Sequence, residues 1–242
     1  MFLAELILVF MQKLDADAIV FDKGNTLLMD PFDAVMELKA EEFGDICRSY
    51  KMYILGSELA EYWTLANKEI NYPFAGHFTQ EEPIIQEALS KLGRDFGFPR
   101  KQTAFIAPEL LIAYRVGVEE VIRKDPRTAE VRQTLQELRE RGHILGVFSN
   151  DRIAGLDMEL AWMGLDGMFE YAETSESTGF EKPDPGVYRH ILAHFQLLPE
   201  RVAYVGDDPV RDIEAAKKAG LKAVLCAVDA RKYFARCRKN RG

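Results

Sequence analysis

Acidic, hydroxyl and amide side chains recur at the ends of short apolar runs along this 242-residue sequence. Asp22 follows the run IVF, Ser149 and Asn150 follow GVF, and Asp207 follows AYVG. A carboxylate at such a place can act as a nucleophile, as a metal ligand or as a cap for the following turn. A hydroxyl and an amide can hold an anion, or they can cap a helix that begins near Ile153. Taken one at a time, these residues leave the alternatives open.

The segment GDDPVRD contains three aspartates, Asp207, Asp208 and Asp212. Pro209 suits the first position of a helix and Asp208 suits the cap before it, which explains Asp208 without chemistry. Asp207 is harder to explain, because adjacent carboxylates repel each other unless a cation lies nearby. Two or three carboxylates and a backbone carbonyl at one sheet edge would form a hard oxygen site that suits Mg²⁺.

Lys182 lies in the segment GFEKPDP, where a lysine before a proline is most often an exposed loop residue. Asp184 and Pro185 fit the N-cap and the first position of a helix with the sequence GVYRHILAHF. We therefore expect Lys182 at the entrance of that helix, near the edge that holds the aspartates.

The elements that would position these residues follow from the apolar pattern. Four short apolar runs are typical of buried parallel strands, and helical patterns such as 128–138 lie between them. Strands that alternate with helices predict an α/β fold with a parallel sheet covered on both faces. Ligands of such sheets bind beyond the carboxyl ends of the strands. The four expected strands are Ala18–Phe21, Ile144–Phe148, Val202–Val205 and Ala223–Val228.

A block at 32–124 lacks the strand pattern and is mostly helical in pattern. Asp-Pro dipeptides at 30–31 and 125–126 flank this block, and both suit linkers. We therefore expect a helical domain inserted into a core domain that consists of 1–31 and 125–242. The helical patterns are DAVMELKAEEF, GSELAEYWTLANKEI, EEPIIQEALSKLG and ELLIAYRVGVEEVIRK.

Composition and charge narrow the class of protein. The chain is 48% hydrophobic and 29% charged, as in an ordinary soluble globular protein. Its net charge of −8 argues against broad nucleic-acid binding, and the basic stretch 231–241 is interpreted as the exposed face of a last helix.

Three scattered cysteines indicate a reducing compartment, so we expect a cytoplasmic protein. The apolar segment 1–11 is too short to span a bilayer, and no membrane partner is expected. The oligomeric state, and the natural start at Met1 or Met11, stay open.

Asp22, Ser149, Lys182, Asp207 and Asp212 follow one another in this order along the chain. The segments FDKGNTL, VFSN, GFEKPDP and VGDDPVRD resemble the four motifs of the haloacid dehalogenase-like superfamily. Members of that family have a Rossmann-like core and are mostly Mg²⁺-dependent phosphohydrolases. The resemblance covers residues 18–220, and the helical block resembles the C1 cap of the family.

The resemblance implies a nucleophile and a metal site. Asp22 would attack the phosphorus of a small phosphorylated substrate and form an aspartyl-phosphate, and its other oxygen would bind Mg²⁺. The Gly24 carbonyl and Asp207 would be further ligands, with Asp212 as a ligand or immediately behind one.

The resemblance also implies residues that hold the phosphoryl group. Ser149 and the backbone near Asn150 would bind its oxygens, and Lys182 would offset the charge on the phosphate and the nucleophile. Thr26 would support the turn. These roles agree with the demands of phosphoryl transfer, which needs an in-line nucleophile and positive charge on the equatorial oxygens.

Gly24 stands where phosphatases of this family usually carry a second aspartate. That acid protonates the leaving oxygen and later activates the water that breaks the aspartyl-phosphate. Its loss is expected to cost about 10²–10⁴ in rate, whereas metal binding should survive because the backbone carbonyl is the ligand. The sequence therefore predicts a Mg²⁺-dependent phosphohydrolase that is slow or restricted to certain substrates, and the physiological substrate stays open.

Three explanations of Gly24 stay open. The substrate can have a good leaving group, or an acid of the cap such as His77 can replace the missing one. The protein can instead resemble phosphonoacetaldehyde hydrolase, which has a small residue here and needs a cap lysine of depressed pKa. Lys39, Lys68 and Lys91 are the candidates. It can also be a regulatory protein that binds Mg²⁺ and a phosphoryl group with little turnover.

Two related chemistries are less favoured. The dipeptide at 22–23, with Thr26, also resembles the phosphorylation motif of P-type ion pumps, but no stretch of the sequence could span a membrane. Dehalogenation is disfavoured because Asp207 and Asp212 indicate a metal that this reaction does not need. The aromatic segment 71–78 is interpreted as part of the cap core, or as a flap over a partly apolar substrate.

Overall fold

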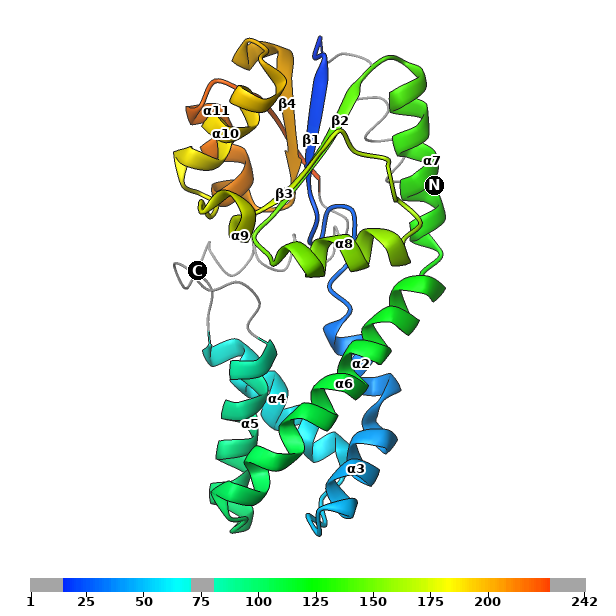
Figure 1. Cartoon of the computed structure of the whole chain (residues 1–242), viewed down its shortest axis with the longest axis vertical. Coiled ribbons are helices and arrows are strands. Elements are labelled where there is room, and N and C mark those ends of the chain that lie inside the picture. The colour runs from blue at the N-terminus through cyan, green and yellow to red at the C-terminus, as the bar shows by residue number, and fades with distance from the viewer. Residues whose placement is uncertain (1–14, 71–80, 227–242) are drawn as a thin grey trace, which may run out of the picture. The chain divides into compact units, whose positions relative to one another are not determined.

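The computed structural model describes residues 15–70 and 81–226 (Figure 1). The chain divides into two compact units. One takes in the described residues up to Asp30 and from Asp125 onward, and the other is Pro31–Lys124. Several sequence-based expectations lie outside the described residues, namely those for 1–11, for 71–78 with His77, for the end of the last strand at 227–228, and for 231–241.

Five parallel strands form the sheet of the first unit, in the order β3-β2-β1-β4-β5. The predicted α/β fold with a parallel sheet is confirmed. One strand, β3, was not predicted, because only its first and last residues are buried and the sequence YAET has no apolar run. The strands are β1 (Ala18–Asp22), β2 (Ile144–Ser149), β3 (Tyr171–Thr174), β4 (Val202–Gly206) and β5 (Lys222–Leu225).

The central strand β1 marks the point where the strand order reverses. From β1 the chain continues outward through β2 and β3, and it then returns to β4 and β5 on the other side of β1. The register places Asp22 opposite Phe148, so that Ser149 lies one residue further along the neighbouring strand. On the other side Phe21 lies opposite Val205. This switch point is the place where open α/β sheets bind ligands.

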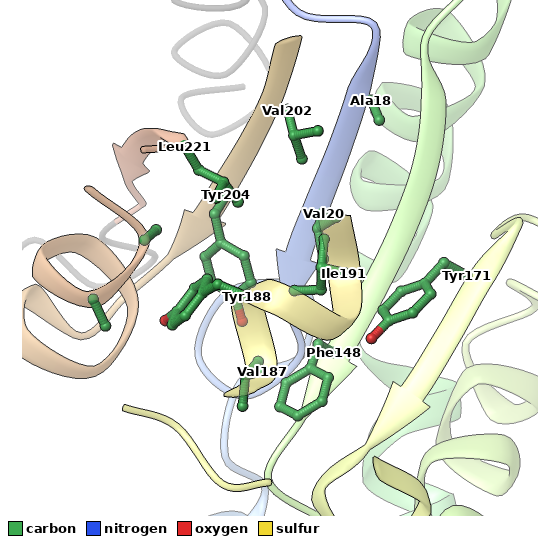
Figure 2. Close-up of a cluster of buried hydrophobic side chains, with 12 residues drawn as sticks. Ala18, Val20, Phe148, Tyr171, Val187, Tyr188, Ile191, Val202, Tyr204 and Leu221 are labelled. Atoms are coloured by element: carbon green, nitrogen blue, oxygen red, sulfur yellow. The ribbon is translucent and has the colours of Figure 1, made fainter. Parts of the chain in front are cut away.

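Helices cover both faces of this sheet (Figure 1). A buried cluster joins α10 and α11 to one face, where Val20, Phe148 and Tyr204 contribute side chains (Figure 2). Alternation along β1 directs Ile19 and Phe21 to the opposite face, on the side of α7 and α8. The helical elements are α7 (Arg127–Glu140), α8 (Ile153–Trp162), α9 (Ser175–Thr178), α10 (Pro185–Phe195), α11 (Ala215–Lys218), a 3₁₀ turn at Pro199–Arg201 and a π-helical turn at Pro209–Glu214.

Two predicted helix starts are confirmed. Asp184 caps α10, because its Oδ1 accepts a hydrogen bond of 2.6 Å from the N–H of Gly186. Asp208 caps the helical turn that begins at Pro209, and its Oδ1 accepts from the N–H groups of Val210 and Arg211, both at 2.9 Å. Both caps fix segments that follow the carboxyl edge of the sheet.

The second unit consists of helices in its described part, and three of its rings pack in sequence. Trp63 lies with its ring centroid 5.6 Å from that of Phe43 and 5.2 Å from that of Tyr114. One predicted helical pattern forms two helices, because Lys39 leaves the helical conformation between them. None of the described helices is both long and apolar enough to cross a membrane. The helices are α2 (Phe32–Leu38), α3 (Ala40–Ser49), α4 (Gly56–Glu69), α5 (Glu81–Phe96) and α6 (Arg100–Lys124).

Candidate active site

Asp22 ends the fully buried strand β1 and is itself only 7% exposed. The chain then folds into a tight turn, in which the carbonyl of Lys23 accepts hydrogen bonds from the N–H groups of Thr26, Leu27 and Leu28. The left-handed residue of this turn is Asn25, with a φ of 54°. The turn therefore presents the Asp22 carboxylate at the carboxyl edge of the sheet.

Gly24 is not required by the conformation of this turn. It is absent from the residues of positive φ, and no described atom lies within 4 Å of the place where its Cβ would stand. Asn25 takes the left-handed conformation instead, as expected for a residue that tolerates it. The glycine thus leaves open space two residues after Asp22.

Lys182 brings two distant carboxylates together. Its Nζ donates hydrogen bonds to Oδ1 of Asp22 at 2.5 Å and to Oδ1 of Asp212 at 2.8 Å. Lys182 is 5% exposed and lies beside the aspartates, where it was expected, and the general tendency of a lysine before a proline to be exposed does not hold here. The pKa of Lys182 is raised well above its ordinary value, because the two carboxylates outweigh the effect of burial. The side chain is therefore a fixed positive charge within the site.

Asn150 holds the Lys182 backbone from both sides. Its Oδ1 accepts from the N–H of Lys182 at 2.9 Å, and its Nδ2 donates to the carbonyl of Lys182 at 3.2 Å. The Asn150 side chain was expected to suit an anion, but these bonds occupy it. The observed contacts give it a different role, which is to position the lysine.

Asp207 and Asp212 complete a group of three acids. Carboxylate oxygens of Asp22, Asp207 and Asp212 all lie within 4.8 Å of one another. The second oxygen of Asp212 accepts from the N–H of Asp208 at 3.0 Å. This close approach needs Gly206, since a Cβ there would lie 2.4 Å from the Asp212 carboxyl carbon.

The charges of this group do not balance. Burial, together with the negative charges of Asp22 and Asp212, raises the pKa of Asp207 to about 6. Burial also raises the pKa of Asp22, although Lys182 opposes this effect. Three gathered carboxylates face one ammonium, and their oxygens are the hard donors that Mg²⁺ prefers. The donor set and its excess negative charge fit a divalent cation.

Ser149 and Thr26 lie near Asp22, at the end of β2 and in the turn after β1. Ser149 ends β2 and is 5% exposed, and within the described parts of the chain its hydroxyl has no hydrogen-bond partner. Thr26 is buried, and its Oγ1 lies 3.5 Å from Oδ2 of Asp22, at the long limit of a hydrogen bond. The alternative that Ser149 or Asn150 caps α8 is wrong, because the N–H of Ile153 donates to the Glu176 carboxylate instead.

A second buried lysine lies beside the nucleophile and was not predicted. Lys23 is 9% exposed, and its ammonium forms ion pairs with Asp151 and with Glu159 on α8. These carboxylates raise the pKa of Lys23 despite its burial. The sequence did hold a signal, because a lysine beside a buried strand end needs acidic partners and Asp151 directly follows Ser149 and Asn150.

Of the candidate cap lysines, Lys39 does not show the depressed pKa that a Schiff base requires. Glu42 accepts from Lys39 at 2.9 Å, and this bond raises the pKa of Lys39 instead of lowering it. Lys91 is paired with Glu69. The side chain of Lys68 lies outside the described parts of the structure.

The fold and the site together define a class of protein. It is a Rossmann-like α/β protein with three carboxylates and a buried lysine at the switch point of its sheet. The model of the haloacid dehalogenase-like hydrolases matches residues 16–220. The chain belongs to this family of hydrolases, as its four motifs predict.

Individual relatives share parts of the chain. A phosphoserine phosphatase of Thermus thermophilus is 34% identical over 152 residues, which are 62% of this chain and 55% of that protein. The alignment thus spans only about half the length of that relative. A glyceraldehyde 3-phosphate phosphatase of Methanothermobacter thermautotrophicus is 29% identical over 159 residues, 61% of this chain and 69% of that protein.

A solved structure shares the fold. The crystal structure of a HAD-hydrolase from Bacillus subtilis, bound to magnesium, superimposes with a TM-score of 0.54 at 19% sequence identity. The superposition covers 87% of this chain and 88% of that one. At this identity the likeness concerns the fold alone.

Proposed function

We propose that this protein is a Mg²⁺-dependent phosphohydrolase that forms an aspartyl-phosphate on Asp22. One observation carries the proposal, namely the meeting of Asp22, Asp207, Asp212 and the Lys182 ammonium at the switch point of the sheet. Membership of the family supports it, and so do two relatives that are phosphatases. The helical unit Pro31–Lys124 is proposed to serve as the cap.

Asp22, Asp207 and the backbone carbonyl of Gly24 would hold Mg²⁺. Asp212 would stand behind them, because it already accepts hydrogen bonds from Lys182 and from the N–H of Asp208. When bound, the cation would neutralise the excess carboxylate charge and draw electron density from the phosphoryl oxygens.

In the first step, an oxygen of the Asp22 carboxylate attacks the phosphorus of a small phosphorylated substrate. A bond forms between this oxygen and phosphorus, and the bond from phosphorus to the leaving oxygen breaks with its electron pair. Lys182 offsets the negative charge on the phosphoryl group and on Asp22. The Ser149 hydroxyl is available to donate to a phosphoryl oxygen.

In the second step, water attacks the phosphorus and the Asp22 carboxylate departs, which releases inorganic phosphate. Neither step receives a proton donor or a base from position 24, because Gly24 has no side chain. We therefore propose substrates whose leaving group needs no protonation, such as acyl phosphates and aryl phosphates. Alkyl phosphate esters should react more slowly.

The test compares acetyl phosphate, an aryl phosphate and an alkyl phosphate ester, each with and without Mg²⁺. Asp22→Asn keeps the shape of the side chain and removes the nucleophile, so hydrolysis should vanish while folding persists. Asp166→Asn makes the same change at an exposed aspartate of the same unit and serves as the matched control. Hydrolysis by Asp22→Asn at the wild-type rate would refute the proposed mechanism.

The open space at Gly24 favours a second candidate, a protein that binds Mg²⁺ and a phosphoryl group with little turnover. Titration calorimetry with inorganic phosphate and Mg²⁺ separates the two. Binding without hydrolysis of any of the three compounds would select the second candidate.

A further inference from the structure

Tyr204 buries a hydroxyl that the proposed reaction does not use. The residue lies on β4 and is 0% exposed, and its hydroxyl has no hydrogen-bond partner among the described residues. A buried polar group without a partner destabilises the fold, whereas a phenylalanine would fill the same space without that cost. The hydroxyl therefore calls for a partner other than the described protein atoms.

The Tyr204 ring lies beside the charged centre of the site. Its centroid is 5.7 Å from Nζ of Lys182. In Figure 2 the ring extends toward the carboxyl ends of the strands with its hydroxyl foremost. Burial raises the pKa of Tyr204 well above its ordinary value, so the hydroxyl keeps its proton and can both donate and accept.

One N–H donor of the Lys182 ammonium has no acceptor among the described residues. An ammonium carries three N–H donors, and within the described structure two of them go to Oδ1 of Asp22 and Oδ1 of Asp212. Nζ lies 5.7 Å from the centroid of the ring that carries the buried Tyr204 hydroxyl. A buried water needs two to four polar partners, and one water between the ammonium and the hydroxyl would satisfy both groups.

We propose that Tyr204 and Lys182 share a buried water molecule, and that Tyr204 thereby positions the Lys182 ammonium for the phosphoryl group, building on the phosphohydrolase function proposed for the same site. The ring adds an attraction of its own, because a cation within about 6 Å of an aromatic face is stabilised by it. Tyr204 itself touches no substrate and is a positioning residue.

Tyr188 offers a matched control on the same face of the sheet. Its ring packs edge-on against that of Tyr204, with centroids 5.4 Å apart and an angle of 70°. The two rings lie side by side in Figure 2. The hydroxyl of Tyr188 differs because it has partners in the protein, since it donates to the backbone carbonyl of Arg211 at 2.5 Å and lies 3.4 Å from that of Asp212. Removal of either hydroxyl takes one oxygen from the same aromatic pair.

The experiment measures kcat, KM and the melting temperature for Tyr204→Phe and Tyr188→Phe, with acetyl phosphate and Mg²⁺. Tyr204→Phe should lower kcat by about threefold to tenfold, the effect of one lost hydrogen bond, with KM nearly unchanged. Its melting temperature should stay close to that of the wild type. Tyr188→Phe should show the opposite pattern, a lower melting temperature with kcat nearly unchanged. If the wild type is active and Tyr204→Phe has the same kcat, the inference is overturned and the proposed function stays intact.

A crystal structure that resolves ordered water gives an independent measurement. A water within hydrogen-bond distance of both the Tyr204 hydroxyl and Nζ of Lys182 is expected. A dry hydroxyl would overturn the inference even if kcat falls. A wild-type protein that neither hydrolyses acetyl phosphate nor binds inorganic phosphate with Mg²⁺ would overturn the proposed function and the inference with it.

Discussion

Two buried lysines flank the nucleophile and differ in their surroundings. Lys182 and Lys23 each pair with two carboxylates, and both are less than a tenth exposed. The partners of Lys182 lie with a third acid, Asp207, whose pKa is raised by burial and by the negative charges of Asp22 and Asp212. The partner of Lys23, Asp151, has its other oxygen satisfied by the N–H of Arg152 at 2.7 Å.

The comparison shows that a buried ion pair does not by itself mark a site. The Lys23 cluster connects the turn after β1 to α8, 136 residues later in the sequence. The carbonyl of Lys23 accepts hydrogen bonds within the turn, and its ammonium is paired with both carboxylates. The Lys23 cluster holds two carboxylates and one ammonium, whereas the Lys182 cluster holds three carboxylates and one ammonium. We infer that the third carboxylate, and not the burial, distinguishes a site for a ligand from a structural contact.

The largest effect is expected from Lys182→Met, which removes the ammonium and keeps a long apolar chain. The phosphoryl group and Asp22 would lose their fixed positive charge, so kcat should fall by about 10²–10³. Steady-state kinetics with acetyl phosphate and Mg²⁺ measure the change. A decrease in kcat of less than about tenfold would mean that Lys182, like Lys23, has a mainly structural role.

The same substitution at Lys23 should act mainly on stability. Lys23→Met leaves Asp151 and Glu159 without their shared cation, and breaking a buried pair in this way costs about 3–5 kcal/mol of unfolding free energy. Urea denaturation measures this loss, and kcat of the folded fraction should fall by much less than in Lys182→Met. The comparison would break down if Lys23→Met were as stable as the wild type and lost activity to the same degree.

The stabilisation of the protein by Mg²⁺ should depend on pH through Asp207 and not through its neighbour Asp208. The folded protein keeps a proton on Asp207 up to about pH 6, whereas the ordinary pKa is 3.8. Without metal, the stability from this group is therefore complete below the ordinary pKa and is lost as pH rises through about 6. The Mg²⁺ response should run the opposite way, because the ionised carboxylate binds the cation.

The measurement is the rise in melting temperature on addition of Mg²⁺, at pH values on either side of that pKa. At a concentration of 100 times Kd the stabilisation should be about 2.7 kcal/mol in the wild type, and most of it should disappear in Asp207→Asn. Asp208→Asn is the control, since asparagine still caps a helix and Asp208 is not among the three gathered acids. An unchanged Mg²⁺ response in Asp207→Asn would remove that residue from the metal site.

Much of this arrangement follows from local sequence. The apolar runs before Asp22, Ser149 and Asp207 predict buried strands, and strand ends in a parallel sheet meet at one edge. Asp184 and Asp208 predict helix starts because a cap depends on residues only two or three positions away. These features need no knowledge of distant contacts.

Other parts depend on contacts between distant segments, which the local sequence pattern does not specify, and were not predicted. The role of Asn150 follows from a loop 32 residues away, and the partners of Lys23 lie 128 and 136 residues away. Tyr204 is indistinguishable from any apolar strand residue until Lys182 is placed above its ring. The edge strand β3 has too few buried positions to produce a pattern.

The smallest expected effect is the gain in hydrolysis rate from an acid at Gly24, which tests whether the Lys182 cluster lacks only a proton donor. Gly24→Asp adds an acid two residues after Asp22, where no described atom would contact the new Cβ, so the variant should fold. An acid able to protonate the leaving oxygen should raise the hydrolysis rate of alkyl phosphate esters by at least about tenfold. Acetyl phosphate, which needs no such proton, should gain much less. Gly24→Asn has the same shape without the proton and is the matched control. A gain shared by Gly24→Asn would be an effect of shape, and no gain in a folded, Mg²⁺-binding Gly24→Asp would mean that the native reaction does not depend on an acid at this position.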